Sequence, residues 1–84
     1  MKVQAEVSLY PLRSTTLLES IARFVRHLRQ CDLEIQVGPM STRLRGESRD
    51  LFRALGEAFE DAAREGDVVL TLKLSNACPP YPES

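Results

Sequence analysis

Apolar and polar residues alternate along four stretches of this chain. From Lys2 to Tyr10 every second residue is apolar, starting at Val3, which is typical of a strand with one buried face. Pro11 predicts the end of this strand, because proline has no N–H to donate to a β-ladder. The same alternation predicts three more strands, over residues 33–37, 40–46 and 67–75.

Two segments between these strands repeat apolar residues at helical spacing. Thr16 and Glu19 form a capping box that predicts the start of the first helix, which ends near Asp32. Ser48 is the predicted N-cap of the second helix, and Gly66 ends that helix as a C-terminal glycine. The predicted buried stripes are Leu17, Ile21, Phe24 and Leu28 on the first helix, and Leu51, Leu55, Ala58, Phe59 and Ala62 on the second.

The order of these elements predicts the fold class. The strands over 33–37 and 40–46 are too close in sequence for a crossover helix, so they form an antiparallel hairpin. The order βαββαβ is an α+β fold of ferredoxin-like type, with two helices on one face of a four-stranded antiparallel sheet. We expect one domain over 1–75 and a proline-rich tail over 76–84. The expected contacts between the layers involve Val3, Val7, Ile35, Leu44, Leu70 and Leu72 on the strands and Phe24, Leu28, Leu55 and Phe59 on the helices.

The composition is that of a small globular domain. A chain with 43% hydrophobic and 27% charged residues has enough apolar material to fold. A net charge of −1 argues against a nucleic-acid partner, which usually needs a basic surface. Two distant cysteines, an early carboxylate at Glu6 and short apolar runs predict neither secretion nor a membrane span, so we expect a cytoplasmic location. Because 84 residues build only a modest core, we expect a homodimer or homotetramer.

The sheet side away from the helices is predicted to be largely polar. It is a solvated surface, a ligand floor, or the dimer face of a structural or regulatory domain that binds no metabolite. Glu6 is unusual there, because carboxylates are disfavoured in mid-strand. It either pairs with Lys73 or Arg43 on a neighbouring strand or accepts hydrogen bonds from a ligand. The residues of this open face are Gln4, Glu6, Ser8, Tyr10, Gln36, Arg43, Arg45, Val69, Thr71 and Lys73.

The sequence offers little for catalysis, and we expect neither an enzyme nor a cofactor. His27 is the only histidine, on the polar side of the first helix. With Cys31 and Cys78 far apart, there is no metal-ligand spacing, and scattered glycines make no phosphate loop. The strand over 40–46 also lacks the aromatic residues on which RNA-binding domains of this order stack bases. Arg13, after the first strand, leaves a hydrolase of the acylphosphatase type as an alternative.

Three segments together resemble a known family. They are Ser8-Leu9-Tyr10-Pro11-Leu12, Gly38-Pro39-Met40-Ser41-Thr42 followed by Leu44 and Gly46-Glu47, and Ser75-Asn76-Ala77-Cys78-Pro79. In register with the βαββαβ pattern, they resemble the YkoF-like thiamine-binding family, whose members bind thiamine or its hydroxymethylpyrimidine portion. The resemblance covers nearly the whole chain. It implies a non-catalytic binding protein, acting as a carrier, buffer or sensor, whose ligand lies against the sheet near these segments.

Carried over to this chain, the resemblance implies a site built from all three segments. An aminopyrimidine both donates and accepts hydrogen bonds, which Ser41, Thr42 and Asn76 can match, and Tyr10 offers a ring for stacking and for a thiazolium cation. Alternatively, Tyr10 covers the sheet edge, and Thr42 is core by strand parity. Asn76 alternatively caps a turn, and Cys78 is an inert thiol. The expected ligand-binding residues are Ser8, Tyr10, Met40, Ser41, Thr42, Asn76, Ala77 and Cys78, with Glu6 added from strand geometry.

Overall fold

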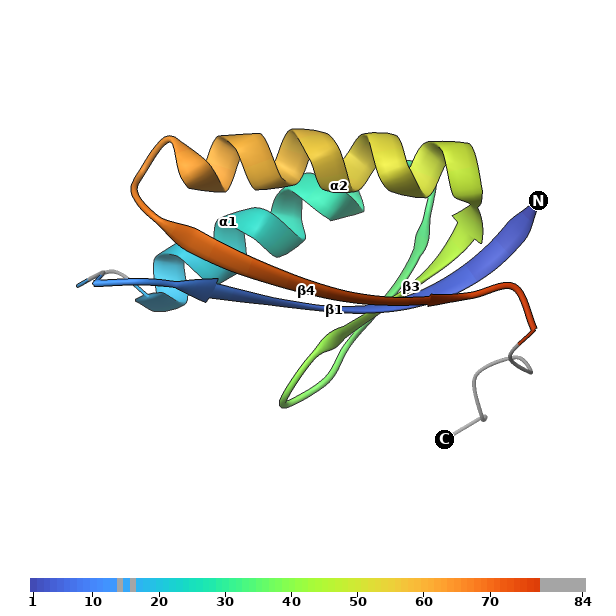
Figure 1. The fold of residues 1–84 in the computed structure, drawn as a ribbon, viewed down its shortest axis with the longest axis horizontal. Coiled ribbons are helices and arrows are strands. Elements are labelled where there is room, and N and C mark those ends of the chain that lie inside the picture. Colours follow the sequence, from blue (N-terminus) through green and yellow to red (C-terminus); the bar gives the residue numbers. More distant parts are fainter. Residues whose placement is uncertain (14, 16, 78–84) are drawn as a thin grey trace.

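The computed structural model describes residues 1–13, 15 and 17–77 and shows two helices packed on one face of a four-stranded sheet (Figure 1). The strand order is β2-β3-β1-β4, and every neighbouring pair is antiparallel. The predicted α+β class and ferredoxin-like βαββαβ order are therefore confirmed. The elements are β1 (Lys2–Pro11), α1 (Leu17–Arg29), β2 (Glu34–Val37), β3 (Thr42–Glu47), α2 (Ser48–Ala63) and β4 (Val68–Ser75).

The central strand β1 organises the core. Its odd-numbered residues from Val3 to Leu9 are buried under the helices, as the alternation predicted. Leu44 of β3 lies opposite Ala5, and its side chain is completely buried. Leu28 of α1 is also completely buried, so both layers contribute to one apolar cluster. The core consists of Val3, Ala5, Val7, Leu9, Phe24, Leu28, Leu44, Leu51, Ala54, Leu55, Ala58 and Ala62.

Several predicted boundaries are wrong by one or two residues. Pro11 does not end β1 but belongs to it, opposite Val68 of β4. Ser48 is not the N-cap of α2: Glu47 occupies that position without a side-chain cap, and the Ser48 N–H donates to the carbonyl of Met1 at 2.8 Å. Strand β3 runs directly into α2, and Met1, directly before the neighbouring strand β1, supplies an acceptor for the Ser48 N–H. The predicted cap at Thr16 lies outside the described residues.

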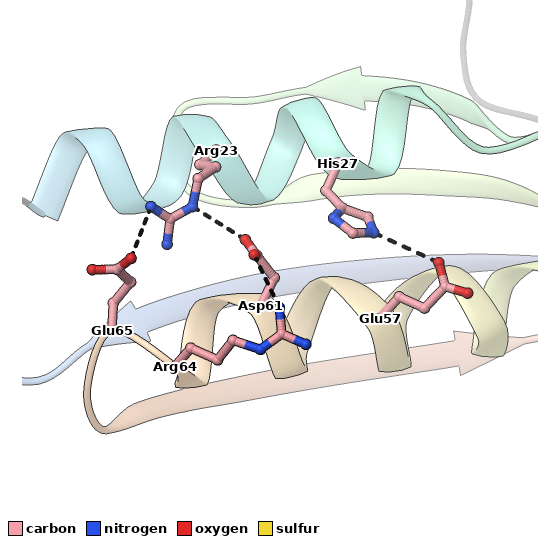
Figure 2. A network of polar contacts seen from close by, with 6 residues as sticks. All are labelled: Arg23, His27, Glu57, Asp61, Arg64 and Glu65. Carbon is pink, nitrogen blue, oxygen red and sulfur yellow. Dashed lines mark hydrogen bonds and ion pairs between the residues drawn. The ribbon is translucent and has the colours of Figure 1, made fainter.

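The two helices are amphipathic and lie side by side over the sheet (Figure 1). Acidic and basic side chains line the seam between them, as Figure 2 shows. In the part of the chain that the structure describes, neither helix is long and apolar enough to cross a bilayer.

The helices leave the edge strand β4 partly uncovered. Leu72 and Phe59 are predicted core residues, but they are 38% and 36% exposed, so this part of the core prediction is wrong. Leu74 on the same strand is 41% exposed, although its backbone partner Ala5 is buried. The register places Leu72 and Leu74 on the helix side of the sheet, beyond the reach of a two-helix layer centred on the inner strands. Leu72 and Leu74 therefore form an exposed apolar border along β4.

Candidate functional site

The first two motif segments lie next to each other on the open face of the sheet. Glu6, Ser8 and Tyr10 alternate with the buried residues of β1 and therefore point away from the helices. The Ser8 hydroxyl donates to the Met40 carbonyl at 3.2 Å, which ties β1 to the β2–β3 hairpin. Tyr10 is 51% exposed, so its ring is available for stacking. The structure thus brings these predicted residues together.

Glu6 occupies the position that the sequence indicated. Its direct backbone partners are Arg43 on β3 and Lys73 on β4. A carboxylate between two cationic neighbours is the cross-strand arrangement expected for structural charge pairing. This register supports charge pairing as the role of Glu6, and its role in ligand binding stays a prediction.

The hairpin divides its predicted residues between the two faces. Met40 is 85% exposed at the turn, and the Gly38 N–H donates to the Ser41 carbonyl at 2.9 Å. Ser41 is half-buried, next to the Ser8 attachment point. Thr42 lies opposite Val7 and is only 8% exposed, on the helix side. The parity alternative for Thr42 therefore describes its position, which leaves Ser41 as the hydroxyl nearer to the open face.

The third motif segment lies at the opposite end of the sheet. Ser75 pairs with Gln4, near the start of β1, and the Asn76 side-chain amide donates to the sulfur of Met1 at 3.8 Å. Tyr10 is six residues further along β1, or about 20 Å away in an extended strand. Within one chain, Asn76 and Ala77 are therefore not brought to Tyr10, and Cys78 lies outside the described residues. Their role as ligand-binding residues stays a prediction.

A hollow of about 400 Å³ opens at the end of the sheet where β1 stops and β4 starts. It continues directly from the first motif segment, because Pro11 and Leu12 form one of its walls. The Leu12 N–H donates to the Asp67 carbonyl at 2.8 Å and thereby fixes the two strand ends together. Arg13 follows with φ of 55°, a left-handed conformation that turns the chain toward α1. Described residues lining the hollow are Pro11, Leu12, Arg13, Thr15, Ser20, Ala62, Glu65, Gly66, Asp67 and Val68.

Ion pairs in the helix seam position one side of this hollow (Figure 2). The Arg23 guanidinium contacts Asp61 at 3.1 Å and Glu65 at 3.4 Å. One turn further along α1, His27 faces Glu57 at 3.7 Å instead of pointing to solvent. Glu65 lines the hollow, and its ion pair with Arg23 helps to fix the Glu65 side chain in the wall of the hollow.

The charge of the hollow limits what it can accept. Arg13 is accompanied by the carboxyl groups of Glu65 and Asp67, which oppose a strongly anionic ligand such as an acyl phosphate. Hydroxyl groups of Thr15 and Ser20 add donors and acceptors without charge. The rim therefore suits a polar ligand that carries a positive charge or none.

The described residues show no group of three or more histidine, cysteine or acidic side chains placed to hold a metal ion. Cys31 is partly buried and its thiol donates to the His27 carbonyl at 3.6 Å. This burial, together with the nearby Glu57 carboxylate, raises the pKa of the Cys31 thiol. A raised pKa makes Cys31 a poor nucleophile.

Comparison with family models gives one match, to the YKOF-related family, over residues 2–81. The chain belongs to this family. Curated protein sequences give no match. The YKOF-related assignment agrees with the resemblance carried by the three motif segments.

Solved structures place this YKOF-related chain among close relatives in fold. A hypothetical protein from Methanocaldococcus jannascii superposes with a TM-score of 0.84 at 27% identity, covering 95% of this chain and 84% of that one. A Streptococcus pneumoniae protein gives 0.83 at 28% identity, covering 89% and 86%. A Thermotoga maritima protein, for which a role in thiamine biosynthesis or salvage has been proposed, gives 0.80 at 22% identity, covering 88% and 82%. At that identity, the last likeness establishes the fold alone.

The hollow is the part of this YKOF-related protein that sequence reasoning missed. Its walls come from the end of β1, the first turn of α1 and the connection from α2 to β4, which are distant in sequence. Only Pro11 and Leu12 belong to a motif that the sequence singled out. The polar residues after them, from Arg13 to Ser20, were a usable local signal.

Proposed function

We propose that this protein binds thiamine or its hydroxymethylpyrimidine portion without catalysing a reaction, as a carrier, buffer or sensor in thiamine metabolism. The observation that carries the proposal is the match to the YKOF-related family over residues 2–81. The role in thiamine biosynthesis or salvage proposed for the Thermotoga maritima neighbour supports the same ligand class. A cytoplasmic location is part of this proposal.

The size and chemistry of the hollow support a ligand of this kind. Its volume of about 400 Å³ lies within the range of small-molecule sites, which runs from roughly 300 to 1,000 Å³. Thiamine combines an aminopyrimidine, a cationic thiazolium and a hydroxyethyl group. Carboxylates of Glu65 and Asp67 favour the cation, and the hydroxyls of Thr15 and Ser20 complement ring nitrogens and amine. The neutral pyrimidine portion fits the same hydroxyls but gains less from the carboxylates.

Calorimetry with thiamine and with hydroxymethylpyrimidine tests this proposal. Asp67→Asn keeps the shape of the side chain and removes its charge, so it weakens thiamine binding by about tenfold and leaves the neutral pyrimidine nearly unaffected. Asp32→Asn is the matched control, because Asp32 is an exposed carboxylate in the connection after α1. Absence of both heat and a thermal shift with either compound refutes the proposal.

We further propose that the working form is a homodimer or homotetramer. The apolar border along β4 supports association, because Leu72 and Leu74 are 38% and 41% exposed in the single chain. The same border favours the second candidate function, an interaction domain that dimerises and binds no metabolite. A stable dimer that gives no heat with either compound identifies that alternative.

A further inference from the structure

The Arg23 side chain of α1 is shared between two carboxylates (Figure 2). Its Nε–H donates a hydrogen bond to Asp61 on α2 at 3.1 Å. Its Nη1 lies 3.4 Å from a carboxylate oxygen of Glu65, which is beyond the usual limit of about 3.2 Å for an N–H···O hydrogen bond. Asp61 is therefore the stronger partner of Arg23, and Glu65 is held mainly by charge.

The Glu65 side chain is placed to exchange one partner for another. Glu65 follows the end of α2 at Ala63, and its side chain is 63% exposed, whereas that of Asp61 is 31% exposed. The Glu65 N–H donates to the Ala62 carbonyl at 3.2 Å, so the backbone stays anchored to the helix while the carboxylate can rotate. Because exposed ion pairs contribute little, breaking the pair with Arg23 costs little.

The same carboxylate belongs to the wall of the hollow. Glu65 lines the hollow together with Arg13 and Asp67, and Arg23 contacts Glu65 from the helix seam. A cation bound in the hollow and the Arg23 guanidinium therefore both attract the Glu65 carboxylate. Glu65 has one cationic partner in the protein and gains a second one when a cationic ligand enters.

We infer that Arg23 is a positioning residue that holds Glu65 while the hollow is empty and competes with a cationic ligand for it. The inference rests on the proposed function, because it concerns the thiazolium cation of thiamine. On binding, the Glu65 carboxylate turns from the Arg23 guanidinium to the ligand. Arg23 keeps its hydrogen bond with Asp61, so its charge stays paired.

This competition lowers the affinity of the hollow for a cation. The ligand gains its contact with Glu65 only by breaking the Arg23–Glu65 pair, and an exposed pair is worth at most about fivefold in a binding constant. The neutral hydroxymethylpyrimidine portion has no cation with which to displace Arg23, so its affinity does not depend on the pair. Arg23 therefore narrows the preference for thiamine and makes bound thiamine easier to release.

Calorimetry on Arg23→Gln with both compounds tests the competition. The substitution removes the competing charge, so thiamine affinity rises by about threefold and hydroxymethylpyrimidine affinity stays unchanged. Asp61 retains Arg64 at 3.8 Å as a partner, so the fold tolerates the change. Arg23→Lys keeps the positive charge and leaves thiamine affinity near the wild-type value. Arg23→Met replaces Arg23→Gln if circular dichroism shows that the latter is unfolded.

Arg53→Gln is the matched control. Arg53 forms an exposed ion pair with Asp50 at 3.1 Å near the start of α2, whereas Glu65 follows the end of the same helix. About 18 Å along the helix axis separate Arg53 from Glu65, more than twice the screening length of about 8 Å at physiological salt. Arg53→Gln therefore removes the same charge from the protein without changing either affinity.

A Glu65→Gln background shows whether Arg23 acts through Glu65. Glu65→Gln removes the shared carboxylate and weakens thiamine binding, and Arg23→Gln then adds little or no gain. An equal gain in both backgrounds means that Arg23 acts on the ligand cation directly, which overturns the inference. Weaker binding of both compounds by Arg23→Gln means that Arg23 serves only the fold, and unchanged thiamine affinity means that it does not compete. Either result also overturns the inference.

The wild-type protein separates this inference from the proposed function. If it binds thiamine and the Arg23 variants give any of the contrary results, the inference fails and the proposed function stands. If it binds hydroxymethylpyrimidine alone, the proposed function again stands and the inference fails. If it binds neither compound, the proposed function fails and the competition for Glu65 fails with it.

Discussion

Replacing Gly46 by alanine isolates one close contact in the core. Gly46 is buried on β3, and a Cβ added there lies 2.7 Å from Leu33 Cδ2 and 3.5 Å from the Asp32 carbonyl oxygen. Its φ is outside the left-handed region, so alanine can adopt the same backbone. The effect of Gly46→Ala is therefore one of packing, and the atom that must move is the far end of a flexible leucine.

The expected size follows from two opposing terms. Overpacking of a core destabilises by about 1–3 kcal/mol, whereas alanine in a strand is more favourable than glycine by about 0.5–1 kcal/mol. The Leu33 side chain can rotate only in part, because it packs against the core. We expect Gly46→Ala to lower the free energy of unfolding by about 0.5–2 kcal/mol, which lowers Tm by several degrees in a domain of this size.

Urea unfolding at one fixed protein concentration measures this loss, since association adds to apparent stability. In a Leu33→Ala background the close contact is absent, so Gly46→Ala becomes neutral or stabilising. Gly56→Ala is the control, because a Cβ at Gly56 on α2 meets nothing within 4 Å and gains about 0.5–1 kcal/mol from helix propensity. An equal loss in both Leu33 backgrounds shows that the contact is not the cause and refutes the reasoning.

Three further outcomes follow from the structure. A double-mutant cycle between Arg23→Ala and Asp61→Ala gives a coupling of about 0.2–1 kcal/mol that shrinks in high salt, because both side chains are about one-third exposed; a salt-independent coupling contradicts this. In a Cys78→Ser background, the rate of Cys31 alkylation by iodoacetamide rises at a higher pH in the folded protein than in the urea-unfolded chain, because folding raises the pKa of the Cys31 thiol. Coincident pH profiles of the two states contradict the burial argument. Thr42→Val leaves thiamine affinity unchanged within about twofold by calorimetry, because Thr42 is buried and does not line the hollow; a larger loss places it in the site.

The sequence by itself determined the element order and the inner half of the core. Alternation along β1 and β3 and the stripe on α1 correctly assigned Val7, Leu44 and Leu28 to the interior. These assignments hold because each depends on local periodicity, and each of these residues lies beneath or within the two-helix layer. The element boundaries were less certain, because the acceptor for the Ser48 N–H comes from Met1, which is adjacent only in the folded sheet.

Periodicity failed where burial depends on position within the sheet. Leu72 fits the alternation of its strand as regularly as Val7 does. Leu72 is nevertheless exposed, because β4 is an edge strand that the helices cover only in part. A pattern along one strand shows which face a side chain takes, but not whether a neighbouring element covers that face. The apolar border of β4 was therefore beyond the sequence.

The candidate site shows the same division. The sequence predicted Ser8, Tyr10 and Met40 as parts of one site, and the structure places β1 next to the hairpin that carries Met40. Only the tertiary structure separated Asn76 from them, because antiparallel strands carry the end of β4 back to the start of β1. The hollow likewise exists only where the ends of β1 and α2 meet the starts of α1 and β4. A linear sequence specifies which residues each element presents, whereas the packing of distant elements decides which of them share a surface.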